Sequence, residues 1–162
     1  MISKLEEYIV PEAISLGLDA TSAEEVIRNL GGKLMNAGFV RESFIEAVLA
    51  REMKMPTGLP LNGYYNAAIP HTDIEHVIKS GIGIATLVKP VVFQNIISPD
   101  EKVDVRLVFI LAIEQPKSLI EMLQEFAGLL QNPQLVADLM HAQHLDQVHE
   151  TLKKAPSITA KV

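Results

Sequence analysis

One stretch of the chain, Val103 to Ile113, is apolar enough to constrain the whole fold. Asp104 and Arg106 keep its beginning polar, and from Leu107 to Ile113 every residue is apolar. A short run that is apolar on both faces is typical of a strand buried on both sides of a sheet. Such a strand needs helices above and below it. The sequence therefore predicts an α/β domain built in layers.

The chain length and composition fit one domain. The 162 residues are 48% hydrophobic and 21% charged, close to the averages of globular proteins, and they show no repeat and no long linker. We expect a single domain over residues 1–162, with its core over about 5–152. The last residues, about 155–162, are expected to form a flexible tail.

Several classes of function are disfavoured by charge and composition. The formal net charge is −6 and no run of basic residues is present, which argues against binding to nucleic acid. The longest apolar run, Leu107 to Ile113, is too short to cross a bilayer, so no membrane insertion is expected. Glu6 and Glu7 stand where a signal peptide would carry bases, and we expect a cytoplasmic protein. The chain has no cysteine, which excludes a thiol nucleophile within it.

Hydrophobic periodicity predicts the other elements. Strands are expected over 13–18, 67–69, 82–88 and 91–93, with Pro90 ending one strand or marking a sheet edge. Helices are expected from about 19–22 to 38, over 42–53, 74–79, from 118 to the break at 132–133, and over 134–140 and 145–152. Capping boxes support three of the starts, at Thr21 or Ser22, at Thr72 and at Ser118. Gly31 and Gly32 disfavour an unbroken first helix.

The stretch Ala67 to Asp73 places a histidine at a strand end. Pro70 biases Ile69 towards an extended backbone, so His71 is expected where the strand stops. A following helix, begun by the Thr72 capping box, would direct backbone N–H groups towards His71 and favour a bound anion. We take His71 as a nucleophile that accepts and passes on a phosphoryl group. An ordinary histidine following a proline remains the simpler interpretation of these residues alone.

The other histidines support chemistry less well. His141 and His144 could share a helical face and bind a metal, but no acidic partner stands at ligand spacing, and we predict no metal site. His76 could share a site with His71, although no third ligand is evident. Nucleotide-binding loops and the serine-hydrolase elbow are absent from the sequence. A histidine- or metal-dependent hydrolase is therefore a weak alternative.

An ordered set of short motifs resembles a known family. Arg51-Glu52, Pro56-Thr57-Gly58 and Ala68-Ile69-Pro70-His71, followed by the long buried strand, are similar to enzyme IIA domains of the bacterial sugar phosphotransferase system. The resemblance is to the fructose–mannitol superfamily, in its galactitol-type branch, and covers roughly residues 5–152. It implies a mixed β-sheet flanked by helices.

The resemblance also implies an activity. His71 matches the histidine that is phosphorylated by the phosphocarrier HPr, and Arg51 matches an arginine beside it. The phosphoryl group would pass to a cysteine of enzyme IIB, which serves a membrane permease, IIC, and the galactitol-type resemblance implies galactitol or a related polyol as the transported sugar. No cofactor is implied. Mannitol-type members carry a second histidine after the long strand, and here that position corresponds to Ser118.

The chemistry of these residues agrees with that role. Phosphoryl transfer requires mainly positioning and charge stabilisation, and a neutral imidazole is a competent nucleophile near pH 7. Arg51 could bind phosphoryl oxygens in a fork, supplemented by the hydroxyls of Thr57 or Thr72. Asp73 would repel phosphate and is better explained as a helix cap. The absence of cysteine places the acceptor thiol on another chain.

A second kind of function remains open. Domains of this family also act as regulators that bind partner proteins according to their phosphorylation state. The chain shows no DNA-binding helix pair and has little spare length for one. A carrier would pass its phosphoryl group to a IIB cysteine, whereas a regulator would retain it and change its affinity for a partner.

Overall fold

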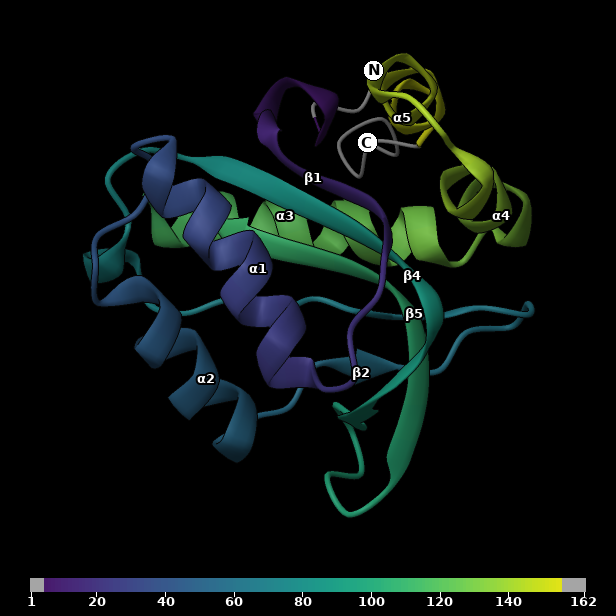
Figure 1. Ribbon diagram of the computed structural model, residues 1–162, viewed down its shortest axis with the longest axis horizontal. Coiled ribbons are helices and arrows are strands. Elements are labelled where there is room, and N and C mark those ends of the chain that lie inside the picture. Colours follow the sequence, from purple (N-terminus) through teal and green to yellow (C-terminus); the bar gives the residue numbers. More distant parts are fainter. Residues whose placement is uncertain (1–4, 156–162) are drawn as a thin grey trace.

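The computed structural model describes residues 5–155. Its elements in chain order are η1 (Leu5–Tyr8), β1 (Ile9–Leu18), α1 (Ala23–Asn36), α2 (Phe44–Lys54), β2 (Gly58–Leu59), β3 (Asn66–Ala68), η2 (Ile74–His76), β4 (Gly81–Gln94), β5 (Lys102–Ala112), α3 (Pro116–Leu130), α4 (Pro133–His141) and α5 (Leu145–Lys153). Here η denotes a 3₁₀-helix. Figure 1 shows these elements along the chain.

The strands form one mixed five-stranded sheet in the order β1-β4-β5-β3-β2. β1 runs parallel to β4 and β3 runs parallel to β5, whereas β4–β5 and β2–β3 are antiparallel. The predicted mixed sheet flanked by helices is confirmed. The strand predicted from the apolar run, β5, is the middle one.

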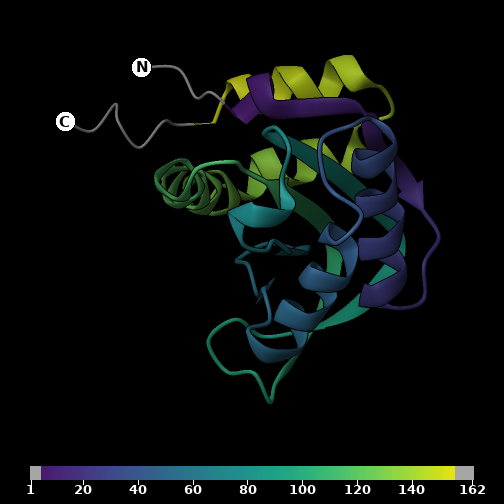
Figure 2. The ribbon, with the colours of Figure 1, turned by 90° about the vertical axis from the view of Figure 1, so that its left-hand side faces the viewer.

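Helices cover both faces of this sheet. Figures 1 and 2 show α1 and α2 on one face and α3 on the other. Alternate side chains of β5 enter two separate clusters: Leu107 and Phe109 pack with residues of α3, whereas Val108 and Ile110 pack with residues of α1 and α2. This alternation explains why the β5 sequence is apolar at consecutive positions.

Two strands are longer than expected. β1 begins at Ile9 rather than at residue 13, and β4 continues through Pro90 to Gln94. The pairing of β4 with β5 shifts register between Thr86 and Val91, and Pro90 lies inside this irregular stretch. A proline is tolerated at a bulge because its missing N–H interrupts no regular ladder there. The prediction that β4 would end near Pro90 was therefore wrong.

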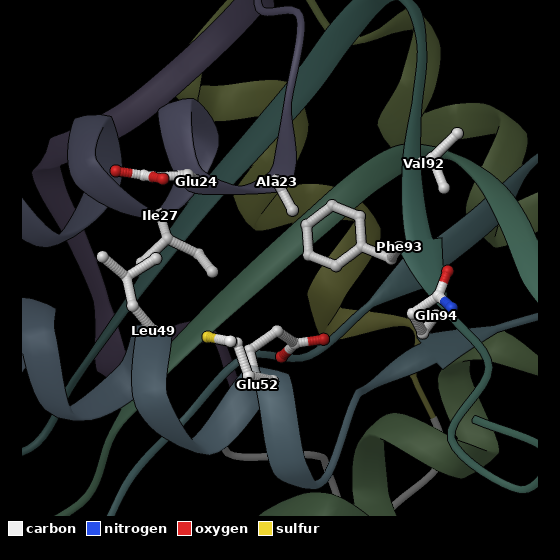
Figure 3. Close-up of a pocket in the computed structure, with 9 residues that line it drawn as sticks. Ala23, Glu24, Ile27, Leu49, Glu52, Val92, Phe93 and Gln94 are labelled. Atoms are coloured by element: carbon white, nitrogen blue, oxygen red, sulfur yellow. The ribbon is translucent and has the colours of Figure 1, made fainter. Parts of the chain in front are cut away.

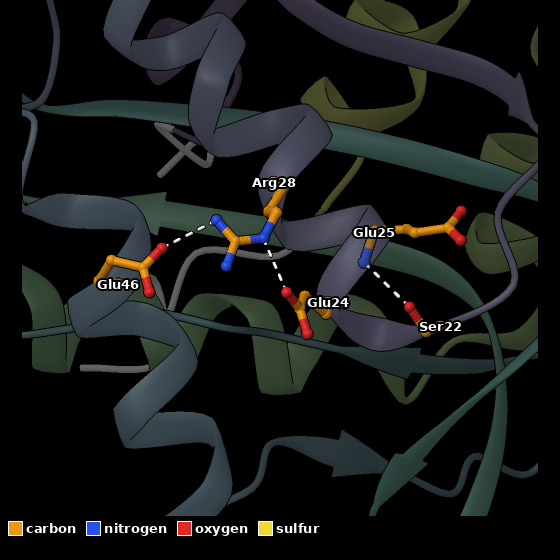
Figure 4. A network of polar contacts seen from close by, with 5 residues as sticks. All are labelled: Ser22, Glu24, Glu25, Arg28 and Glu46. Atoms are coloured by element: carbon orange, nitrogen blue, oxygen red, sulfur yellow. Dashed lines mark hydrogen bonds and ion pairs between the residues drawn. The ribbon is translucent and has the colours of Figure 1, made fainter.

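The first helix is unbroken in spite of its two glycines. A Cβ atom at Gly31 would lie 2.8 Å from Cγ1 of Ile45, so glycine permits the close approach of α1 and α2. Arg28 joins these helices by hydrogen bonds to Glu24 and Glu46, both 2.8 Å long (Figure 4). Figure 4 also shows the N-cap of α1, where the Ser22 hydroxyl accepts from Glu25 N–H.

The C-terminal helices begin differently from the prediction. α3 starts at Pro116 with Gln115 as its N-cap, so the predicted capping box at Ser118 was wrong. Proline at the first helical position has a suitable φ angle and lacks an N–H that would go unpaired. Ala155, assigned to the expected tail, is buried, and the remainder of that tail lies outside the described residues. Among the described helices none has the length and apolar character needed to span a membrane.

Candidate functional site

His71 lies just beyond β3, beside the end of the central strand. β3 pairs with β5 through Ala67 and Ala68, and the backbone N–H of Leu111 then donates to the carbonyl of Pro70 at 3.0 Å. His71 itself forms an isolated parallel bridge with Leu111. Only 9% of the residue is exposed. The backbone that carries this imidazole is thus held by the most deeply buried strand of the sheet.

The ring of His71 is fixed by its own backbone. Nδ1 lies 2.8 Å from the carbonyl oxygen of Ile69. A carbonyl can only accept, so this contact assigns the proton to Nδ1 and leaves the lone pair on Nε2. Within residues 5–155, Nε2 has no hydrogen-bond partner. The arrangement presents one nucleophilic nitrogen in a defined direction.

The surroundings of His71 keep the ring neutral. Burial lowers the pKa of the imidazole, and the positive charge of Arg51 lowers it further. The hydrogen bond to Ile69 and the charge of Asp73 act in the opposite direction but do not reverse the shift. The pKa of His71 therefore lies below its ordinary value of 6.5. The lowered pKa favours the neutral imidazole, in which Nε2 keeps its lone pair.

Arg51 lies in the last turn of α2 and brings a cation to this site. Its side chain is 30% exposed, and Nη1 lies 3.7 Å from a carboxylate oxygen of Asp73. Its Nε atom is buried and makes no hydrogen bond to any part of the chain that the structure describes. Arg51 therefore keeps an unpaired N–H donor near His71. A solvated arginine at a helix end would instead have its donors bound to water.

Thr57 is buried, and its hydroxyl makes two hydrogen bonds. It donates to Glu52 at 2.9 Å and accepts from the N–H of Ile69 at 3.3 Å. The following residue, Gly58, passes close to β4, where a Cβ atom would lie 2.6 Å from the carbonyl oxygen of Gln94. The Thr-Gly pair thus joins a buried hydroxyl to a position at which a side chain would clash.

The segment after His71 differs from the prediction. Residues Ile74–His76 form one turn of 3₁₀-helix, capped by Asp73 without a side-chain hydrogen bond, and the predicted helix over 74–79 does not form. Val77 instead bridges to Val40 in extended conformation. The predicted Thr72 capping box and helix N-terminus facing His71 were therefore wrong. Thr72 is buried and makes no side-chain hydrogen bond within the described chain.

The remaining histidines and Ser118 do not join this arrangement. His141 ends α4 and His144 precedes α5, so the pair does not share one helical face. Among the described residues, no group of three or more histidine or acidic side chains is arranged to hold a metal. Ser118 lies in the first turn of α3 and lines a hollow with Ser80 and Glu114. No hydrogen bond or ion pair within residues 5–155 joins Ser118 to His71.

Sequence reasoning missed the role of Glu52. It appeared only as half of the Arg51-Glu52 motif, yet its carboxylate accepts from both the N–H and the hydroxyl of Thr57, at 2.8 and 2.9 Å. Burial raises the pKa of Glu52, and the Thr57 hydrogen bonds and the charge of Arg51 oppose this shift. A Glu followed five residues later by Thr-Gly was the available signal.

Comparison with protein families identifies the group to which the fold and these motifs belong. The model for "Phosphoenolpyruvate-dependent sugar phosphotransferase system, EIIA 2" matches residues 7–155. The chain belongs to this family. The resemblance inferred from the motifs, including its fructose–mannitol fold type, is thereby confirmed.

Individual relatives give the same result. The galactitol-specific EIIA component of Escherichia coli K12 is 32% identical over 124 residues, which span 76% of this chain and 81% of that protein. The crystal structure of IIA mannitol from Escherichia coli matches with a TM-score of 0.74 at 28% identity, covering 89% of this chain and 98% of that one.

A solved complex shows how such a domain is used in another protein. The Escherichia coli complex of enzyme IIA mannitol with phosphorylated enzyme IIB mannitol contains a chain that matches with a TM-score of 0.72 at 28% identity. The match covers 89% of this chain and 96% of that one. An EIIA domain of this fold therefore pairs with an EIIB partner in that system.

Proposed function

We propose that this EIIA protein is a phosphocarrier that accepts a phosphoryl group from phospho-HPr on Nε2 of His71 and passes it to a cysteine of enzyme IIB. The observation that carries the proposal is the state of the His71 ring. Its Nδ1 is bound to the Ile69 carbonyl, while Nε2 has no partner in the described chain. A neutral ring with one open lone pair is what phosphoryl acceptance requires.

The transfer balances without a cofactor. The Nε2 lone pair attacks phosphorus, the P–N bond to Nε2 forms, and the bond between phosphorus and the HPr histidine breaks. A thiolate of enzyme IIB then attacks the same phosphorus, which forms a P–S bond and returns a neutral imidazole to His71. No proton is abstracted from His71 in either step, so a second histidine at Ser118 is not required for the balance.

Arg51 supplies the charge that these steps require. Its buried Nε–H donor and its loose 3.7 Å contact with Asp73 leave the guanidinium able to turn towards phosphoryl oxygens. A fork of N–H donors matches phosphate geometry and stabilises the charge that develops during transfer. We assign Thr72 a supplementary hydroxyl contact. Thr57 is not assigned a phosphoryl contact, because its hydroxyl is already hydrogen-bonded to Glu52 and to the N–H of Ile69. It instead fixes the backbone that leads to His71.

The physiological partners follow from the relatives. The galactitol-specific relative at 32% identity favours a IIB protein and a IIC permease for galactitol or a related polyol. An EIIA domain does not contact the sugar in this scheme, so the polyol assignment belongs to the permease. We infer a cytoplasmic location because HPr and the IIB cysteine would have to reach the same histidine.

The test is phosphorylation with purified components. Incubation with phosphoenolpyruvate, enzyme I and HPr is expected to yield an acid-labile, base-stable phosphate, mapped by phosphopeptide analysis to His71. Subsequent addition of the polyol enzyme IIB should discharge the label onto its cysteine. No label, or label on His76 or His141, would overturn the proposal. A label that IIB does not remove, together with altered affinity for another protein, would instead favour the regulatory alternative.

A further inference from the structure

Glu52 is a half-buried acid on α2. It lies in α2 next to Arg51 and faces a hollow lined by apolar side chains, among them Leu49 and Phe93 (Figure 3). An ionised carboxylate in such surroundings is destabilised unless hydrogen bonds compensate for lost water. Both of its oxygens accept from Thr57, at 2.8 and 2.9 Å.

A continuous path of hydrogen bonds leads from Glu52 to the imidazole. The Thr57 hydroxyl donates to Glu52 and accepts from Ile69 N–H at 3.3 Å, while the Thr57 carbonyl accepts from the same N–H at 3.4 Å. The Ile69 carbonyl then accepts from His71 Nδ1 at 2.8 Å. Every polar group along this path is hydrogen-bonded, and the path ends at Nε2 of His71, which has no hydrogen-bond partner in the described chain.

We propose that Glu52 is a positioning residue for phosphoryl transfer, acting through Thr57 and Ile69 to hold the His71 ring in its Nδ1–H tautomer. The inference rests on the proposed role of His71 as phosphoryl acceptor. Glu52 does not touch the reacting atoms. It sets the position of the Ile69 carbonyl, which accepts the hydrogen bond from His71 Nδ1–H.

The direction of the hydrogen bonds explains why an acid suits this position. A carboxylate only accepts, so the Thr57 proton must point to Glu52 and a hydroxyl lone pair must face Ile69 N–H. The N–H and the carbonyl of Ile69 belong to different peptide units. Thr57 therefore affects the carbonyl only by fixing the position of the Ile69 backbone, not through a shared hydrogen-bonded group. Fixing the N–H of Ile69 limits the movement of its carbonyl, and with it the ring of His71.

Isosteric substitutions separate this role from general stabilisation. Glu52→Gln retains one acceptor and reverses the second hydrogen bond, and Thr57→Val removes the hydroxyl at similar volume. Thr57→Ser retains the hydroxyl and is the conservative rescue. Glu46→Gln is the matched control, because Glu46 lies on the same helix and pairs with Arg28 on the exposed side.

Two measurements are made on each variant, with the melting temperature recorded to confirm folding. ¹⁵N-imidazole NMR reports the tautomer of His71 without requiring any transfer. Steady-state kinetics with phospho-HPr and IIB separates kcat from KM. For Glu52→Gln and Thr57→Val we expect a mixed His71 tautomer and about a tenfold lower kcat, with KM unchanged, because loss of orientation slows the chemical step. Thr57→Ser and Glu46→Gln should match the parent protein.

The double variant completes the test. If Glu52 acts through Thr57, combining Glu52→Gln with Thr57→Val slows transfer no more than either change alone. A His71 tautomer unchanged in both single variants would overturn the proposal, as would a shifted tautomer with normal kcat or a fully additive double variant. If the parent protein accepts no phosphoryl group, the proposed function fails, whereas the tautomer measurement still shows whether Glu52 holds the ring.

Discussion

Two imidazoles that lie five residues apart, those of His71 and His76, are held in opposite ways. His71 follows β3 and has one nitrogen bound and the other open. His76 ends η2, where Nδ1 lies 2.7 Å from the Ser43 hydroxyl and Nε2 lies 3.7 Å from the Glu75 carboxylate. His76 has a side chain that is 22% exposed, but neither of its nitrogens is free of a partner.

The reactivity that we propose for His71 and not for His76 rests on an open lone pair and not on exposure. His71 is attached to a buried strand, so its backbone supplies the acceptor that fixes the tautomer. His76 lies in one turn of 3₁₀-helix, and its ring is held by side chains from the surface. The following predictions test this contrast, beginning with the largest effect.

Substitution of the two histidines should give opposite results. His71→Gln is expected to abolish labelling from phospho-HPr, because the amide has no nucleophilic lone pair to form the P–N bond. His76→Gln should label at the parental rate. Autoradiography of both variants after incubation with enzyme I and HPr measures this. Equal loss in both would mean that the contrast between the two rings has no chemical consequence.

Removal of the guanidinium should slow transfer without unfolding the protein. Arg51→Ala is expected to lower kcat by about 10²- to 10³-fold, the usual effect of losing one preorganised donor to developing charge. Its partly exposed side chain and loose contact with Asp73 suggest little change in melting temperature. Quench-flow transfer to IIB, with Arg28→Ala as a surface control, measures the effect. Parental kinetics in Arg51→Ala would remove this residue from the site.

The buried ring should also make stability depend on pH. Because the pKa of His71 is lowered in the folded protein, the unfolded chain binds more protons between that lowered value and about 6.5. Stability therefore rises with pH across this interval. The free energy of unfolding of the parent, relative to His71→Gln, should increase as pH approaches 6.5 and level off above 7. Urea titrations from pH 5 to 8 test this, and a flat difference would contradict it.

Neutralising Asp73, which follows His71 by two residues, should have the smallest effect. Asp73 raises the pKa of His71 and contacts Arg51 at 3.7 Å. Asp73→Asn should lower the pKa of His71 slightly, visible in an NMR titration, and change transfer by less than about tenfold because the contact is exposed. The exposed Glu42→Gln variant provides the control. An upward pKa shift would contradict the assigned electrostatic effect.

The layered fold was readable from sequence because β5 is apolar at consecutive positions. The alternation of apolar residues could not predict that β4 continues through Pro90. The irregular pairing that accommodates this proline depends on how β4 aligns with β5. The capping boxes at Thr72 and Ser118 failed for a related reason. In both segments the residue spacing of a capping box is present. After Thr72, however, the bridge of Val77 to Val40 keeps the chain extended, and before Ser118 the helix has already begun at Pro116.

The candidate site was only partly readable. His71 and Arg51 were predicted from the family motifs, and in the structure the charge of Arg51 lies close enough to lower the pKa of His71. The importance of Glu52 depends on the chain turning back after α2 ends at Lys54, so that Thr57 meets its carboxylate. Such a contact depends on the path of the chain after the helix, which hydrophobic periodicity does not predict.

The small exposed fraction of His71, 9%, has a kinetic consequence. A residue with so little exposed surface can meet only one visiting protein at a time, so phospho-HPr must depart before IIB arrives. The proposed carrier should then show ping-pong behaviour, with parallel lines in double-reciprocal plots. Each partner would also act as a competitive inhibitor towards the other.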